Sequence, residues 1–514
     1  MNRDRRGLAR RARFLAAGTI LLGAGLASTA QADHGLDPTY FPSLGYFVDI
    51  FATVSGQSAR YGGKHAVLPN GDIVVAGIVR LENDTIAPYW NIGLVRYSPQ
   101  GYPRLWTGSG GPYFHNFNQY VLYPNLTNGG TGDALIESVE DIAYAEGKIY
   151  VLVTRVFGGV ERDAAVVVFN EDGTFQQNLS VIASTANEYA RALEVTVTGI
   201  TAKPVTLTVL AERYAPLARM VVTKLNLGSN GLLSADANFN GGAPLVVPFN
   251  CTGGGCGFYA GDIARPKRFF QGDGMPIYVV GSAQYNGPDW DFAVVRINAN
   301  GTIDTSFGAG GTNYFDFSEP GSDSGDFAYR LDIDSGIPGL TADTLFIAGN
   351  VRRSCKDGIG IVAVTSENQI PAGFGVGGRV VHGGSSETGT ICAQEASLYL
   401  GDLARQGNEL AVAGTTASLD QGGTLRVDGA LLRVDATNGS QRGLARLPIE
   451  YQGERFGDAR LRGISHAGQG RYLVSGDLTN TIANLGPVFL SAAVAPSDRI
   501  FADGFDRSVV LPTL

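Results

Sequence analysis

Four polar residues recur at one place in a repeated phrase, and their types allow chemistry. His65, Asp141, Asp262 and Asp402 each stand at the start of a short segment that leads through a turn into an apolar run. Carboxylates gathered around one axis could hold a hard cation such as calcium. They could equally accept hydrogen bonds from backbone N–H groups and lock neighbouring units together. The residue types alone leave both interpretations open.

Two Asp-x-Asp motifs and several glycine-rich segments also carry residue types that occur in ligand sites. Residues 289–291 read Asp-Trp-Asp and residues 332–334 read Asp-Ile-Asp, but neither continues as an EF-hand loop does. We interpret both as alternating strand residues beside a turn. The segments 253–256 and 308–311 predict turns, because a phosphate cradle needs a following helix and none is readable here.

The histidines and serines give little support for hydrolytic chemistry. No histidine occurs in an HxxxH or HExxH spacing, and no G-x-S-x-G segment lies at a plausible strand-to-helix elbow. The histidines of the chain are His34, His65, His115, His382 and His466. A metal-dependent hydrolase is therefore weakly supported.

Aromatic residues gather around a long insertion at 102–137. They are Trp90, Tyr97, Trp106, Tyr113 and Phe114. Their rings could stack on sugars, or they could cover the apolar core of the unit that carries them. We expect the second role.

The elements that must position these residues are visible as a two-strand phrase that returns seven times. Each phrase has an apolar run that ends in a small residue, and then a second apolar run that ends in a turn. The first runs occupy 71–77, 147–153, 205–211, 275–281, 343–349, 408–414 and 470–476. The second runs occupy 91–101, 163–173, 218–231, 291–301, 358–368, 428–439 and 486–498. Such self-similarity is the signature of a repeat architecture.

Each unit has room for four strands. Candidate strands precede the first runs at 65–68, 140–145, 191–198, 261–266, 329–334, 401–406 and 461–466. Others follow the second runs at 242–249, 311–317, 377–383 and 444–451, with weaker versions at 115–124 and 177–183. A four-stranded unit cannot bury both of its faces alone, and radial repetition of such units is the propeller solution. The preceding strands would then line the central channel.

The chain is therefore expected to be all-β, a seven-bladed β-propeller over residues 45–495. A strand-like segment at 45–54 stands before the first unit, whereas the seventh unit lacks a convincing fourth strand of its own. We expect 45–54 to supply that outermost strand and close the ring, since an open ring leaves an unpaired edge. Six or eight blades are the main alternatives. A solenoid would not need the early strand, and a β-sandwich pair would not show seven equivalent phrases.

One stretch resembles a known repeat family. Residues 277–311, IYVVGSAQYNGPDWDFAVVRINANGTIDTSFGAGG, are similar to the delta-60 repeat of bacterial secreted proteins, and residues 345–378 keep only parts of that phrase. The resemblance implies a propeller in an extracytoplasmic setting and supplies no catalytic residues. The segment 498–506 resembles the Ile-Phe-x-Asp-Gly-Phe-Glu phrase at the ends of secreted proteins of xanthomonad-like bacteria, with Asp506 where Glu is usual.

The two ends of the chain and its charge indicate secretion. Residues 1–32 combine six arginines, a short apolar stretch from Phe14 to Leu26 and an Ala30-Gln31-Ala32 cleavage pattern, which predicts a signal peptide cut near Ala32. We expect a lead-in at 33–44, a tail at 496–514 and no transmembrane segment in the mature chain. The formal charge is −9, and it becomes about −14 without the signal peptide. An acidic chain of this kind argues against nucleic acid as a partner.

The four cysteines fit an oxidising compartment. An even number in a secreted chain predicts two disulfides, which we expect to be Cys251–Cys256 and Cys355–Cys392. Zinc is the rival interpretation, but the spacing lacks a CxxC and no histidine lies close by.

Two classes of function remain open. The first is a non-catalytic module that binds an unknown protein or a polysaccharide, with His65, Asp141, Asp262 and Asp402 at the channel mouth as candidate binding residues. The second is an extracytoplasmic enzyme, such as a lyase, a hydrolase or a quinoprotein dehydrogenase. We favour the first, because no polar constellation converges in the sequence. No cofactor is firmly implied, and calcium is possible.

Overall fold

The protein is described from a computed structural model. Its description covers residues 36–37, 39–41, 46–49, 60–80, 90–108, 114–115, 120–123, 135–157, 161–182, 186–199, 203–214, 218–247, 258–268, 274–285, 289–317, 325–337, 340–353, 356–383, 397–419, 425–447, 450–451, 454–455, 458–467, 470–480 and 486–494. The expected signal peptide, the four cysteines and the C-terminal phrase lie outside these residues, so the secretion and disulfide predictions stay predictions.

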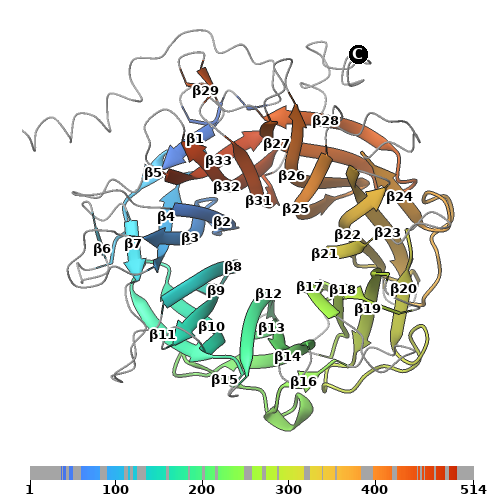
Figure 1. Cartoon of the computed structure of the whole chain (residues 1–514). Coiled ribbons are helices and arrows are strands. Elements are labelled where there is room, and N and C mark those ends of the chain that lie inside the picture. Colours follow the sequence, from blue (N-terminus) through green and yellow to red (C-terminus); the bar gives the residue numbers. More distant parts are fainter. Residues whose placement is uncertain are drawn as a thin grey trace, which may run out of the picture.

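Seven antiparallel sheets stand side by side in a ring around a central axis (Figure 1). The first comprises β2 (Arg60–Val67), β3 (Ile73–Arg80), β4 (Trp90–Tyr97), β7 (Tyr120–Tyr123) and β6 (Phe114–His115), with β5 (Pro103–Arg104) beside β4. The second comprises β8 (Leu135–Ala145), β9 (Lys148–Phe157), β10 (Glu161–Asn170) and β11 (Phe175–Ser180). The third comprises β12 (Asn187–Val197), β13 (Val205–Tyr214), β14 (Ala218–Leu227), β15 (Leu233–Ala235) and β16 (Leu245–Val246), with a 3-10 turn at Asn240–Gly242. These are blades one to three.

Blades four to seven repeat the four-strand order. The fourth comprises β17 (Phe258–Ala264), β18 (Ile277–Ala283), β19 (Asp291–Ile297) and β20 (Thr312–Phe315). The fifth comprises β21 (Asp326–Asp334), β22 (Thr344–Arg353), β23 (Lys356–Thr365) and β24 (Arg379–His382). The sixth comprises β25 (Ser397–Gln406), β26 (Glu409–Leu419), β27 (Leu425–Asp435) and β28 (Gln441–Leu447), and a separate hairpin of β29 (Glu450–Tyr451) and β30 (Glu454–Arg455) follows it. The seventh comprises β31 (Ala459–His466), β32 (Tyr472–Asn480), β33 (Gly486–Val494) and β1 (Tyr46–Asp49). The predicted seven-bladed, all-β propeller is confirmed.

The ring closes by strand pairing between the two ends of the chain. Strand β1 pairs with β33, with Tyr46 opposite Ala492, as the early strand-like segment predicted. The residues before β1 reinforce this seam: the N–H of Asp37 donates to the carbonyl of Ala493 at 2.8 Å. The buried Tyr40 hydroxyl lies 2.6 Å from Ser491 Oγ. The edge of β33 is therefore paired rather than open.

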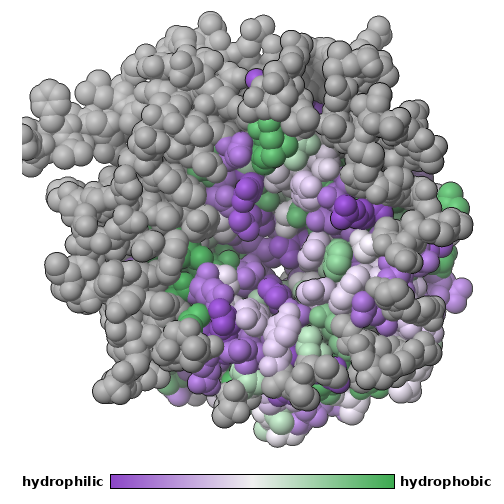
Figure 2. Space-filling model, in the orientation of Figure 1, coloured by the Kyte–Doolittle hydropathy of each residue, from purple (hydrophilic) through white to green (hydrophobic). Residues whose placement is uncertain are grey.

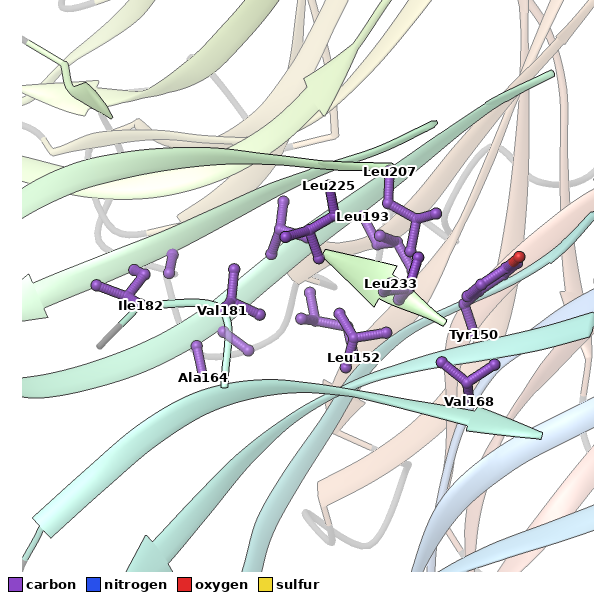
Figure 3. Packing of buried hydrophobic residues seen from close by; sticks show 14 of the residues in the cluster. Tyr150, Leu152, Ala164, Val168, Val181, Ile182, Leu193, Leu207, Leu225 and Leu233 are labelled. Carbon is purple, nitrogen blue, oxygen red and sulfur yellow. The ribbon is translucent and has the colours of Figure 1, made fainter. Parts of the chain in front are cut away.

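The core consists of apolar layers between adjacent blades. Because both faces of a central blade strand are covered, all seven residues of β18 are buried. Figure 3 shows one such layer, in which Leu152 and Val168 of blade two pack toward Leu193 and Leu207 of blade three. Burying each side chain of this size contributes about 1.5–3 kcal/mol. The unbroken apolar runs of the repeat are thus explained by burial on both sides.

Close backbone packing explains why the first run often ends in glycine. In the fifth blade, a Cβ on Gly349 would lie 2.0 Å from the carbonyl oxygen of Phe327, and in the fourth a Cβ on Gly281 would lie 2.2 Å from that of Tyr259. These carbonyls come close because the innermost strand bulges directly afterwards, between Ala328 and Arg330 in blade five. Glycine is needed wherever the bulge presses the backbone this near.

Candidate functional site

A β-bulge in the innermost strand of every blade sets one residue at the same level of the channel wall. The residues directly after the seven bulges are His65, Asp141, Ala192, Asp262, Arg330, Asp402 and Gly463. We call this set the channel ring. It contains all four residues predicted as site candidates. Figure 2 shows hydrophilic residues gathered around the hollow centre of the molecule.

The three ring aspartates fasten three pairs of neighbouring blades: two to three, four to five and six to seven. Asp141 Oδ2 accepts a hydrogen bond from the backbone N–H of Leu193 at 2.9 Å, and Asp262 Oδ2 accepts one from Leu331 at 3.0 Å. Asp402 Oδ2 accepts one from Ile464 at 3.0 Å. The donors lie on the channel-facing edge of the next innermost strand, where a ladder partner is missing. The carboxylates thus satisfy N–H groups that would otherwise be unpaired.

The second oxygens of two of these carboxylates face basic side chains. Lys64 Nζ lies 3.2 Å from Asp141 Oδ1 and 4.0 Å from Asp402 Oδ1. Arg330 Nε lies 3.1 Å from Asp402 Oδ1 and 3.0 Å from the carbonyl of Gly401. Lys64 therefore bridges carboxylates of blades two and six, and Arg330 pairs with the carboxylate of the blade that follows its own. The sequence analysis missed both, although Lys64 directly precedes His65 and Arg330 occupies the ring position of its own repeat.

Burial and charge act together on the titration of this ring. Burial and Arg330 both lower the pKa of Lys64, but the three ring carboxylates outweigh them and raise it. Burial raises the pKa of Asp262, and the neighbouring cations oppose that effect. Burial lowers the pKa of Arg330, and the surrounding carboxylates more than compensate. Lys64 and Arg330 therefore remain charged and balance the carboxylates.

His65 has a different role, at the seam between blades one and seven. Its Nδ1 lies 2.8 Å from Ser475 Oγ and its Nε2 lies 2.6 Å from Ser465 Oγ. Ser475 Oγ also donates to the carbonyl of Gly63 at 3.0 Å. Burial lowers the pKa of His65 to about 4, so the His65 imidazole is uncharged at neutral pH. His65 thus bonds to the blade that closes the propeller.

A second row of polar residues supports the same junctions from the second strands. Ala190 N–H donates to Thr154 Oγ1 at 3.0 Å, and Ala328 N–H donates to Ser282 Oγ at 2.9 Å. Leu400 N–H donates to Asn350 Oδ1 at 2.8 Å. The three acceptors directly follow the last residue of the first run in their repeats. That position is visible in the sequence, so the repeat alignment could have revealed them.

Above the ring, the starts of four innermost strands carry aromatic side chains at one level. Each lies three residues before its ring residue, in consecutive blades three to six. They are Tyr189, Tyr259, Phe327 and Tyr399. We call them, with Trp290, the aromatic arc. Tyr259 is 42% exposed and Tyr399 37% exposed, whereas the other three are half-buried.

The middle of the aromatic arc is a packed platform. The Tyr259 ring lies 4.6 Å from Trp290 and 5.6 Å from Phe327, centroid to centroid. Trp290 and Phe327 are 5.7 Å apart at an interplanar angle of 33°. At one end, the guanidinium groups of Arg162 and Arg191 lie 5.4 and 5.7 Å from the Tyr189 ring. These rings fix one another in place and leave apolar surface at the channel mouth.

The aromatic residues predicted to cover the first blade do so where the structure describes them. Tyr97 and Trp106 are each 1% exposed, and Trp106 packs in the layer between blades one and two. The side chains of Trp90, Tyr113 and Phe114 lie outside the described part of the chain. The exposed aromatic surface is thus formed by other residues than those singled out from the sequence.

The two Asp-x-Asp motifs have different surroundings. In the second, Asp332 Oδ2 accepts the N–H of Arg405 at 2.8 Å, and Asp334 pairs with the Arg405 guanidinium at 2.5 Å. Both lie in β21, so this motif is a strand segment, as expected. In the first, Asp291 is the first residue of β19 and lies near Asp289 and Asp316. The segment 308–311 is a turn, with Gly308, Gly310 and Gly311 at positive φ.

A cavity of about 470 Å³ lies at the other ends of the strands, between blades one and two. Its walls include Asp72, Arg96, Arg104 and Glu171. Arg96 Nε lies 2.8 Å from Asp72 Oδ2, and a guanidinium nitrogen of Arg96 lies 3.8 Å from Glu171. The charged side chains that line this cavity are thus largely paired with one another. The aromatic arc, in contrast, has part-exposed rings.

Comparisons with known proteins bear mainly on the fourth blade. A family model described as domain of unknown function (DUF5122) beta-propeller matches residues 271–307, within blade four and overlapping the stretch that resembles the delta-60 repeat. A search of curated proteins returns no match. Within the described residues, no helix has the length and apolar character needed to cross a membrane.

Solved structures with similar folds are distant. The polysaccharide lyase Uly1 has a TM-score of 0.42 and 11% identity, over 92% of this chain and 95% of its own. The WD40 domain of Pan2 from Neurospora crassa has a TM-score of 0.40 and 8% identity, over 89% and 97%. A protein of unknown function from Dyadobacter fermentans has a TM-score of 0.34 and 12% identity, over 75% and 98%. At these scores and identities, the likeness carries no argument about activity.

Proposed function

We propose that this protein is a non-catalytic binding module that recognises a polysaccharide at the channel mouth, over the aromatic arc. The observation that carries the proposal is the set of part-exposed rings at one level in four consecutive blades. Such surfaces on a folded protein mark interaction sites. The channel ring below them acts as a braced floor, because its carboxylates hold one blade to the next.

The chemistry of the surface favours a glycan. Sugar rings present flat apolar faces and a rim of hydroxyl groups, which suits amphipathic tyrosine and tryptophan rings beside polar groups. Tyr259 and Tyr399 offer both an exposed ring and a phenolic hydroxyl. Arg162 and Arg191, beside Tyr189, add hydrogen-bond donors at one end of the arc. A chain of several sugars could contact more than one blade.

The same proposal places the protein outside the cytoplasm, in the periplasm, at the cell surface or in the medium. Its support is the signal-peptide pattern of residues 1–32, the even cysteine count and the resemblance of residues 277–311 to the delta-60 repeat. As part of this proposal, we assign the blade-four repeat to the delta-60 type. Mass spectrometry of the protein exported by a bacterial host tests the localisation: a mature N-terminus at Ala32 or Asp33 supports it, and an uncleaved chain overturns it.

Affinity electrophoresis in gels that contain single polysaccharides, together with a glycan array, tests the binding function. We expect retardation by at least one polymer and a loss of affinity of up to about tenfold in Tyr259→Ala, because truncating a stacked ring removes roughly 0.5–1.5 kcal/mol. The matched control is Tyr102→Ala, since Tyr102 is 51% exposed but belongs to blade one. Equal retardation of both variants, or no binding across the panel, would overturn the proposal.

The enzyme alternative is tested in the same samples. Reducing-end and unsaturated-product assays, with calcium and with a quinone added in separate reactions, report turnover. Turnover that disappears in Asp141→Asn and Asp262→Asn while circular dichroism is unchanged would replace the binding function with a catalytic one. Retention by an immobilised protein in place of glycans would assign the arc to a protein partner.

A further inference from the structure

The row of residues that forms the aromatic arc continues into blade seven with an arginine. Arg460 lies three residues before the channel-ring residue of its blade, the position that Tyr399 occupies in blade six. Arg460 is exposed, and its guanidinium group has no ion pair among the described residues. Asp477 faces it in the register of β31 and β32 but pairs with Arg462 instead, at 2.5 Å. The arc thus ends in a basic residue whose charge is not matched.

Packing between blades six and seven sets this arginine beside Tyr399. A Cβ on Gly401, two residues after Tyr399, would lie 2.0 Å from the carbonyl oxygen of Leu461, the residue after Arg460. The equivalent contact between blades four and five would measure 2.5 Å, and there the two aromatic rings of the row are 5.6 Å apart. Because equivalent junctions of a repeat bring equivalent positions together, the backbone of Arg460 lies next to that of Tyr399.

A second arginine lies near the other end of the arc. Arg219, the second residue of β14, is half-buried, and its guanidinium carbon lies 5.7 Å from the centre of the Phe258 ring, directly before Tyr259 in the chain. One of its nitrogens donates to the carbonyl of Ala218 at 3.0 Å. Within the described part of the chain, it has no carboxylate partner. The aromatic ring and the carbonyl therefore hold the guanidinium group in place without neutralising it.

The strand register leaves this end of blade three with an excess of positive charge. Arg213 lies directly opposite Arg219, and the buried Glu188 lies opposite Arg213 on its other side. This row of the described strands therefore has one carboxylate for two guanidinium groups. Like charges directly opposite each other on a sheet are destabilising. A negatively charged ligand group at Arg219 would relieve that repulsion.

Several carboxylates near the arc are already matched by a cation. Glu137 lies 2.6 Å from Arg162, and Glu212 lies 2.6 Å from Arg191. In blade seven, Asp477 is taken up by its own arginine partner. These pairs leave the charges of the two arginines at the ends of the arc uncompensated.

An acidic group surrounds Trp290, in the middle of the arc. Carboxylate oxygens of Asp289, Asp291 and Asp316 lie within 4.8 Å of one another. The N–H of the buried Asp326 donates to the Trp290 carbonyl at 2.9 Å. Negative charge here disfavours an anionic ligand group over the middle of the arc. Such groups are therefore expected at its two ends.

We infer that the glycan is an anionic polysaccharide, which stacks sugar rings on the aromatic arc and places carboxylate or sulfate groups at Arg460 and Arg219. This inference rests on the proposed function. A guanidinium group binds an oxyanion through two parallel N–H donors, and such charge-assisted hydrogen bonds are stronger than neutral ones. Uronic acids and sulfate esters share this chemistry. The net charge of −9 does not prevent binding, because physiological salt largely screens exposed charges farther away than about 8 Å.

Two matched pairs of polymers test the class of ligand. Polygalacturonate and its methyl ester have one backbone with and without charge, as do dextran sulfate and dextran. We expect affinity electrophoresis and biolayer interferometry to show about tenfold tighter binding to the charged member of at least one pair, because two exposed arginine–oxyanion pairs each contribute up to about fivefold. A preference for polygalacturonate over its ester assigns the carboxylate, and a preference for dextran sulfate over dextran assigns the sulfate.

Substitution of the two arginines tests where the charge is read. Arg460→Gln and Arg219→Gln should each weaken binding of the charged polymer about threefold to fivefold and leave binding of uncharged polymers unchanged. Arg460→Lys keeps the charge but loses the planar fork, so it should recover part of the affinity. The matched control is Arg104→Gln, which removes the same charge from a side chain that is 55% exposed in blade one. Circular dichroism checks that each variant is folded.

The outcomes separate this inference from the proposed function. Glycan binding that depends on Tyr259 but not on the charge of the polymer, or that both arginine variants retain in full, would overturn the inference and leave the proposed function standing. Absence of binding to every polymer overturns both. If Arg104→Gln weakened binding of the charged polymers as much as Arg460→Gln, the protein would act as a general ion exchanger and the inference would be wrong.

Discussion

Lys64 Nζ lies 3.2 Å from Asp141 Oδ1 and joins the first blade to the second inside the channel. Both side chains are only 12% exposed. The same ammonium group faces Asp402 across the ring, so one lysine serves carboxylates of two other blades. Without Lys64, Arg330 is the remaining one of the two cations that the ring carboxylates Asp141 and Asp402 contact.

Lys64→Met should therefore destabilise the propeller. Breaking a buried pair on one side costs about 3–5 kcal/mol, and partial exposure to the channel reduces this to roughly 2–3 kcal/mol. Urea unfolding followed by tryptophan fluorescence measures the change. Lys203→Met is the control, because Lys203 Nζ also lies 3.2 Å from a carboxylate, that of Glu146, but the two are 52% and 38% exposed. Equal effects of the two substitutions would contradict a bracing role for Lys64.

Asp262→Ala should loosen the junction between blades four and five. It removes the acceptor for two backbone N–H groups, those of Ile263 at 2.8 Å and Leu331 at 3.0 Å. We expect a loss of about 2–3 kcal/mol and faster hydrogen exchange at the Leu331 amide. Asp262→Asn keeps one acceptor oxygen and should recover part of the protection. Unchanged exchange at Leu331 in the alanine variant would show that the carboxylate does not hold this junction.

The seam at His65 should make stability depend on pH. The pKa of His65 is lowered to about 4 in the folded state, against about 6.5 in the unfolded chain. Below pH 6.5 the unfolded chain binds a proton that the folded protein does not, so stability is complete above about pH 7 and falls as the pH drops from about 6.5 toward 4. The polar and charged groups that face the His65 imidazole are those of Ser465, Ser475, Lys64 and Asp402.

His65→Gln provides the comparison for this effect. Glutamine can still bond to the serines but does not titrate, so its unfolding free energy should fall less steeply between about pH 6.5 and 4. The two slopes should differ by up to about 1 kcal/mol per pH unit. If the unfolding free energies of the wild type and His65→Gln changed in parallel with pH, His65 would not be the source of the pH dependence.

Gly349→Ala should be costly for a steric reason. The added Cβ would lie 2.0 Å from the Phe327 carbonyl oxygen, which belongs to backbone that cannot move aside cheaply. We expect a destabilisation of about 2–3 kcal/mol in thermal unfolding, in the range of overpacked cores. Gly274→Ala is the matched control, since no atom of the described residues lies within 4 Å of a Cβ there. A neutral Gly349→Ala would show that the bulge does not press on this strand.

Removing the residues that precede Arg60 should open the ring. Strand β1 and the contacts of Asp37 and Tyr40 would be lost, so β33 would present an unpaired edge. Size-exclusion chromatography should show association, and the unfolding temperature should fall. A truncated chain that stays monomeric and equally stable would contradict closure by β1.

The repeat could be recognised from the sequence alone, and with it the fold. Seven apolar runs, six of which end in glycine or alanine, reflect strands buried on both faces and a backbone contact at positions such as Gly349. These are local consequences of blade geometry. The early strand was recognisable because the seventh unit lacked a fourth one. His65, Asp141, Asp262 and Asp402 were placed at one level of the channel for the same reason, since equivalent positions of a repeat stay equivalent in space.

What the repeat could not supply was the contact between blades. The strand period assigns a side chain to a face but does not say which residue of the next blade it meets, so the donors to Asp141 and the partners of Lys64 emerged only from the closed ring. The two Asp-x-Asp motifs look alike in sequence, yet one meets Arg405 and the other meets Asp316 and Asp326. The burial of Asp326 against Trp290 and Phe317 depends on how blade five packs on blade four. Charge balance at these junctions is a property of the assembled propeller, because it is set by residues far apart in the chain.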